Sequence, residues 1–99
     1  MQDVKQQRRY QREQVLEEGK LTIQNRTMTV DVLDVSLQAE LNKVQGFGII
    51  APHALMAKSR CTLHLPSSRY AGEYNCIAIY SQDTGFGMRI GLQVEATAE

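Results

Sequence analysis

The chain of 99 residues has no tryptophan, only two prolines, two cysteines and two histidines, and a formal net charge of zero. Lysines plus arginines equal aspartates plus glutamates at eleven each, so no overall field attracts nucleic acid or an anionic membrane. No apolar run approaches the length that spans a bilayer, and the N-terminus lacks the hydrophobic segment of a signal peptide. We therefore expect a single soluble, cytoplasmic domain.

The scarcity of cysteine and histidine argues against several kinds of site. Cys61 and Cys76 are too few for a disulfide framework, and a reducing compartment would keep them as buried thiols, placed near each other by a hairpin around residues 67–70. Cys61 and His64 would point to opposite faces of one strand, which does not suit a shared metal ion. His53 has no partner at a ligand spacing, and no catalytic signature occurs. We expect neither a metal site nor an enzyme.

What the sequence does contain is strand-like patterning. Four short segments alternate polar and apolar residues with a period of two, and a fifth is apolar on both faces. These segments are 20–24, 27–32, 61–65, 87–94 and, apolar on both faces, 74–80, and turn residues separate them at 25–26, 46–48, 66–68 and 83–85. Only residues 8–18 and 51–58 could hold a helical turn or two. The pattern predicts an all-β antiparallel barrel or sandwich.

The tripeptide Gly-Phe-Gly occurs twice, at residues 46–48 and 85–87. The second copy continues as "GFGMRIG", which misses the dinucleotide-binding fingerprint and leads into a strand rather than a helix. We interpret both copies as hairpin turns.

Two polar features remain to be explained. Arg8, Arg9 and Arg12 place three of the seven arginines within five residues, as either a solvated tail or a contact to an anion. Asp34 and Ser36 share one side of an extended segment, which taken alone is typical of an Asx-turn at the end of a strand.

Together the two features resemble the PilZ domain family, whose signature is RxxxR followed by D/N-x-S-x-x-G. Arg8-xxx-Arg12 matches the first motif, and Asp34-x-Ser36-x-x-Ala39 matches the second with alanine in place of glycine. The segment "GFGMRIGLQVE" is similar to the last barrel strand of the family, so the resemblance extends to about Glu95. PilZ domains are six-stranded antiparallel, split β-barrels that serve bacteria as receptors for cyclic di-GMP.

The resemblance implies an all-β fold with a flexible basic N-terminal arm at residues 1–14 and a six-stranded PilZ-type barrel at 15–96. It also implies a ligand, cyclic di-GMP, and no other cofactor. A guanidinium binds phosphate or guanine by two parallel hydrogen bonds and stacks on a base. Arg8 and Arg12 would therefore grip the ligand, with Arg9 as an auxiliary phosphate contact.

The second motif would contact the other guanine. Its N1–H and N2–H₂ groups are adjacent donors that suit the carboxylate of Asp34, and the Ser36 hydroxyl would complete the contact. Ala39 would lie close to the base, at the position of the family glycine.

Binding would order the arm and reshape the surface that an unidentified protein partner contacts, in a pathway such as motility or biofilm formation. The alternative is a PilZ-like protein-interaction module that binds no cyclic di-GMP. A small barrel for single-stranded nucleic acid is disfavoured, because four tyrosines and two phenylalanines are too thinly spread to form a stacking platform.

Overall fold

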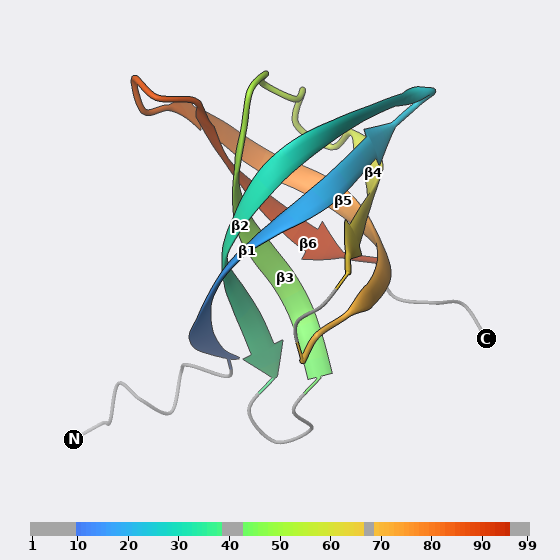
Figure 1. Ribbon diagram of the computed structural model, residues 1–99, viewed down its shortest axis with the longest axis vertical. Coiled ribbons are helices and arrows are strands. Elements are labelled where there is room, and N and C mark those ends of the chain that lie inside the picture. The colour runs from blue at the N-terminus through green and yellow to red at the C-terminus, as the bar shows by residue number, and fades with distance from the viewer. Residues whose placement is uncertain (1–9, 39–42, 67–68, 96–99) are drawn as a thin grey trace.

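The computed structural model describes residues 10–38, 43–66 and 69–95, which form six strands and no helix. In chain order the strands are β1 (Tyr10–Ile23), β2 (Arg26–Gln38), β3 (Lys43–Ala51), β4 (Arg60–Leu65), β5 (Gly72–Asp83) and β6 (Met88–Val94). Neighbouring strands are antiparallel in the order β1-β2-β3-β6-β5-β4, and β4 pairs back to β1, so the sheet closes into a ring (Figure 1). The predicted all-β, six-stranded antiparallel fold is confirmed. Within the described ranges, no helix is long and apolar enough to cross a membrane.

The interior of the ring is filled by apolar side chains from every strand. Those with 0% exposure are Leu21, Val32, Val35, Ile49, Leu63, Cys76, Ala78 and Ile90. Phe47 packs edge-on against Tyr74, with 4.9 Å between the ring centroids. Each buried side chain of leucine or phenylalanine size contributes about 1.5–3 kcal/mol. In β2, β4 and β6 the intervening residues face outward, whereas residues 46–49 of β3 are all buried.

The described residues of the two segments considered for helical turns are not helical. The structure describes residues 10–18 of the first, and they lie in β1, while residues 52–59 form a loop between β3 and β4. In β1 the pairing with β2 shifts register between Gln14 and Glu17, and Leu16 adopts a φ of 53°. Such a bulge shifts which side chains face inward, so the period-two pattern that marks a strand is lost across it.

Only one of the two Gly-Phe-Gly copies is a turn. Residues 85–87 connect β5 to β6, with the Thr84 amide donating to the Gly87 carbonyl over 3.0 Å, as predicted. Residues 46–48 lie inside β3, so the turn prediction is wrong there. The glycines of β3 serve close packing instead: a Cβ on Gly46 would lie 2.5 Å from the carbonyl oxygen of Leu92 on β6.

The boundary expected between an arm at 1–14 and a barrel at 15–96 falls inside β1. Residues 10–14 pair with residues 34–38 of β2 and therefore belong to the sheet, whereas residues 1–9 lie outside the described part of the chain. The register shift in β1 follows directly after Gln14, but β1 continues through it to Ile23.

The ring closes through a short contact between its first and fourth strands. β1 pairs with β4 only where residues 20–22 meet residues 62–64, as far as the described residues show. Nearer the start of β1, the carboxylate of Glu13 accepts a hydrogen bond from the Tyr70 hydroxyl and lies 3.5 Å from the Arg69 guanidinium. Side-chain contacts therefore hold the beginning of β1 against the β4–β5 connection, beyond the reach of its backbone pairing to β4.

Cys61 and Cys76 are direct register partners on β4 and β5, as expected for the hairpin. Both are free and buried. Burial raises the pKa of the Cys61 thiol from an ordinary value of 9.0 to about 11 and that of Cys76 to about 12, with neighbouring charges adding smaller effects. Both cysteines are therefore neutral, apolar members of the core at physiological pH.

Candidate functional site

Two strands bring three of the predicted site residues together. Arg12 and Ser36 are register partners in the β1–β2 pairing, and Asp34 lies two residues from Ser36 on the same outer face. Nη1 of Arg12 is 3.3 Å from Oδ1 of Asp34, so the two side chains form an ion pair across 22 residues of sequence. The other three predicted site residues lie outside the described part of the chain: Arg8, Arg9 and Ala39.

Asp34 does not sit in a turn at the end of a strand. It lies within β2, where it pairs with Gln14 of β1 and with Gly48 of β3, so the Asx-turn interpretation is wrong. The strand continues because Val35 and Leu37 supply two further inward-facing apolar side chains. Asp34 therefore presents its carboxylate on the outer face, where only 18% of the side chain is exposed.

A second guanidinium approaches the same carboxylate from the other side. Nη2 of Arg89, on β6, is 3.6 Å from Oδ2 of Asp34. Arg89 is paired in register with Ile50 of β3 and reaches diagonally across that strand. Arg89 lies outside both motifs, and its position before the inward-facing Ile90 in the alternating segment 87–94 marks it as an outward-facing cation.

Glycines make this reach possible. Gly48 of β3 lies between Asp34 and Gly91 of β6 in the register, so no side chain separates the carboxylate from β6. A Cβ on Gly48 would lie 2.7 Å from Oδ1 of Asp34, and a Cβ on Gly91 would lie 2.5 Å from the ring of Tyr80. The Asp34 carboxylate therefore covers Gly48, and the Tyr80 ring covers its register partner Gly91. Neither glycine adds a side chain to the outer face between the two groups.

A shallow groove of about 260 Å³ adjoins this surface. Its lining comes from β2, β3 and β6: Ser36, Gln45, Gly46, Leu92 and Gln93. Gln45 donates through Nε2 to Oε1 of Gln38 over 3.2 Å, which fixes the side chain at the rim. The groove thus adds hydroxyl and amide groups beside two guanidiniums and a carboxylate. Such a set suits a flat ligand that carries both anionic oxygens and paired N–H donors.

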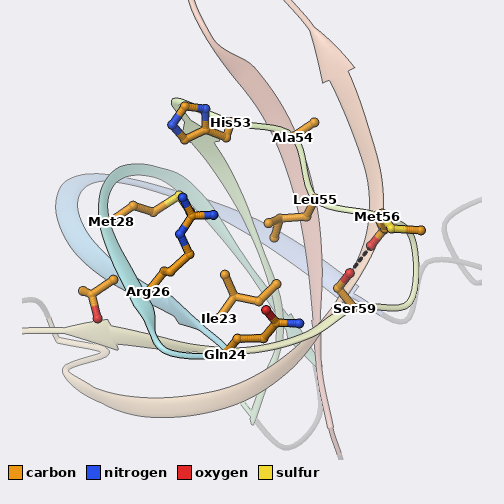
Figure 2. A pocket seen from close by; sticks show the side chains of 10 residues that line it. Ile23, Gln24, Arg26, Met28, His53, Ala54, Leu55, Met56 and Ser59 are labelled. Atoms are coloured by element: carbon orange, nitrogen blue, oxygen red, sulfur yellow. Dashed lines mark hydrogen bonds between the residues drawn. The ribbon is translucent and has the colours of Figure 1, made fainter.

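A larger hollow of about 640 Å³ lies at the opposite end of the ring, between the β1–β2 hairpin and the β3–β4 loop (Figure 2). Its lining includes the apolar Ile23 and Leu55 together with Arg26 and His53. None of the described site residues predicted from the sequence lines this hollow. Among the residues that the structure describes, no three His, Cys, Asp or Glu side chains gather to hold a metal ion.

Comparison with known proteins identifies no relative of this chain. No family model matches it, and neither the curated proteins nor the solved structures contain a significant match. The likeness to the PilZ family therefore remains a prediction that depends on the motif residues and their positions.

Proposed function

We propose that this protein is a bacterial cytoplasmic receptor that binds cyclic di-GMP on the outer face of β1, β2, β3 and β6 and signals to a protein partner. The observation that carries the proposal is the meeting of Arg12, Asp34 and Ser36 on one surface, with 3.3 Å between the guanidinium and the carboxylate. These three are the motif residues that the structure describes: Arg12 belongs to the first motif, and Asp34 and Ser36 belong to the second.

The chemistry of the surface fits the two parts of this ligand. The Arg12 side chain is 62% exposed, so its guanidinium can turn toward a phosphate or stack on a guanine. The Asp34 carboxylate is largely shielded from water, which strengthens hydrogen bonds from the adjacent N1–H and N2–H₂ donors of guanine. Ser36 and the groove beside it offer further polar contacts to the base.

A route to a protein partner begins one residue from Arg12. Successive side chains of a strand point to opposite faces, so Glu13 is directed away from the ligand surface and contacts Tyr70 and Arg69. A movement of residues 10–14 on ligand binding would act on both contacts. The surface at residues 69–70 is therefore where we expect a partner to sense the ligand.

The test is calorimetric titration of cyclic di-GMP into wild-type protein and the Arg12→Ala variant. Loss of a charge-assisted contact costs about 1.5–3 kcal/mol, which is a tenfold to hundredfold loss of affinity. Stability should fall by less than about 1 kcal/mol, because the Arg12 side chain is mostly exposed. Arg12→Lys should recover part of the affinity, since an ammonium group neither stacks flat nor donates in a fork.

Arg60→Ala is the matched control. Arg60 also forms an exposed ion pair, with Nε 3.1 Å from Oε2 of Glu95, but it lies on β4, away from the site. Its replacement should leave the affinity unchanged. Wild-type protein that gives neither heat nor a melting shift with excess cyclic di-GMP would reject the receptor proposal.

A ligand-independent interaction module is the second candidate function. It is favoured by apolar side chains at the end of the ring that carries the larger hollow: Met56 is 80% exposed and Phe86 is 96% exposed. A partner protein that binds at this end would cover both side chains, and Met56 lines the larger hollow. If wild-type protein does not bind cyclic di-GMP but Phe86→Ser abolishes co-purification with a partner, this function replaces the first.

A further inference from the structure

We propose that Arg89 is a positioning residue of the same site, which holds the Asp34 carboxylate in place when Arg12 leaves it for the ligand. The inference rests on the proposed binding of cyclic di-GMP and adds to it a residue that lies outside both motifs.

Without ligand, the groups that should bind it are occupied with each other. Oδ1 of Asp34 is 3.3 Å from Arg12, and Oδ2 is 3.6 Å from Arg89. The paired N–H donors of a guanine edge require both carboxylate oxygens. The guanine edge must therefore share the two oxygens with the guanidiniums or replace one of them.

Exposure and strand pairing indicate that Arg12 is the one that moves. Its side chain is 62% exposed, against 34% for Arg89. Arg12 lies before the bulge of β1, where the described backbone pairing is to β2 alone, whereas Arg89 is paired on both sides, with Ile50 and Gln82. The more exposed Arg12, whose strand segment is paired on one side, can turn to the ligand while the less exposed Arg89 stays in place.

Arg89 then performs two tasks for the remaining carboxylate. It balances a negative charge that is largely shielded from water, which would otherwise be costly to leave unpaired. It also fixes the orientation of the carboxylate. The carboxylate lies so close to Gly48 that a Cβ at that position would be 2.7 Å from Oδ1, so it has little room to rotate. Each carboxylate oxygen accepts two hydrogen bonds, so Oδ2 can bind Arg89 and a guanine N–H at the same time.

The experiment is a double-mutant cycle on cyclic di-GMP affinity with Arg89→Ala and Asp34→Asn, measured by calorimetry and, for weak variants, by NMR titration at millimolar ligand. Arg89→Ala alone should weaken binding roughly tenfold, and Arg89→Lys should restore part of it. In the Asp34→Asn background, Arg89→Ala should change the affinity by less than about twofold, because Arg89 acts through the carboxylate. Arg60→Ala should bind like wild type.

Two results would overturn the inference while leaving the receptor proposal intact. One is wild-type affinity in Arg89→Ala; the other is an equal loss with and without the Asp34 carboxylate, which would mean that Arg89 acts by another route. Absence of binding by the wild-type protein would reject both proposals. A double-mutant cycle of urea unfolding on the same variants, measured without ligand, tests the Arg89–Asp34 pair separately from ligand binding. Non-additive changes of the urea midpoint would show that the two side chains interact even if the protein binds no ligand.

Discussion

Replacing Gly48 by alanine tests the geometry of the candidate site most directly. The new Cβ would lie 2.7 Å from Oδ1 of Asp34 and 3.2 Å from both Cγ and Oδ2. Ordinary van der Waals contact begins at 3.4 Å, so Oδ1 must move by about 0.7 Å, the difference between 3.4 and 2.7 Å. The same oxygen is 3.3 Å from Arg12, so the movement cannot leave that ion pair unchanged.

The expected effect falls on binding rather than on folding. A displaced carboxylate loses one charge-assisted hydrogen bond to the ligand, about 1.5–3 kcal/mol, which is a tenfold to hundredfold loss of cyclic di-GMP affinity. Stability should change by no more than about 1 kcal/mol. The disturbed ion pair with the exposed Arg12 contributes little, and alanine lowers the entropy of the unfolded chain by a compensating amount.

Calorimetry and thermal melting of Gly48→Ala, alone and combined with Asp34→Ala, provide the assay. With the carboxylate removed, the alanine at position 48 should cost much less stability, because the three atoms nearest to its Cβ all belong to the Asp34 carboxylate. Wild-type affinity in Gly48→Ala would refute the idea that the carboxylate rests on this backbone. A large loss of stability that persists in the double variant would refute it as well.

Two further predictions concern the fold. Leu16→Gly should raise the urea midpoint whereas Leu16→Ala should not, because a left-handed backbone (φ 53°) costs a non-glycine residue about 1–2 kcal/mol and the Leu16 side chain is 66% exposed; equal midpoints would contradict this. The thiols of Cys61 and Cys76, with pKa values of about 11 and about 12, should react with a disulfide reagent at pH 8 only after unfolding. The fold raises the pKa of both thiols above the ordinary 9.0, so their contribution to stability is complete below pH 9 and is lost as the pH rises through 11 to 12. Urea midpoints that do not fall above pH 9 would contradict this prediction.

All five predicted segments fall on observed strands. Segments 61–65, 74–80 and 87–94 correspond to β4, β5 and β6, the last beginning one residue before β6. Segments 20–24 and 27–32 cover only the adjoining halves of β1 and β2, and residue 24 lies in the turn between them. The pattern does not predict β3, because its two glycines contribute no side chain to the alternation and resemble a turn. It does not predict the first half of β1 either, since the bulge at Leu16 breaks the alternation and one-letter patterns carry no information on strand register.

The site is predictable as far as the motifs reach. Arg12, Asp34 and Ser36 meet because an antiparallel pairing of β1 with β2 brings the two motifs side by side. Arg89 is not predictable, since its distance from Asp34 depends on β3 lying between β2 and β6 and on Gly48 at the crossing. Sequence periodicity shows which face a residue occupies but not which strand is its neighbour.

The short pairing of β1 with β4 has a consequence for how the molecule folds. The β1–β2 and β4–β5 hairpins join residues close in sequence, whereas Lys20 and His64 are brought together from distant parts of the chain. Contacts between distant residues require a large loop to close first, so they form slowly and late. The pairing of β3 with β6 also joins distant residues, but it has six register pairs against three for β1 with β4. We therefore expect the ring to exist first as an open, curved sheet, with the β1–β4 junction as the last to form and the first to part. The ring can then open at this junction while β1 stays paired with β2 and β4 stays paired with β5.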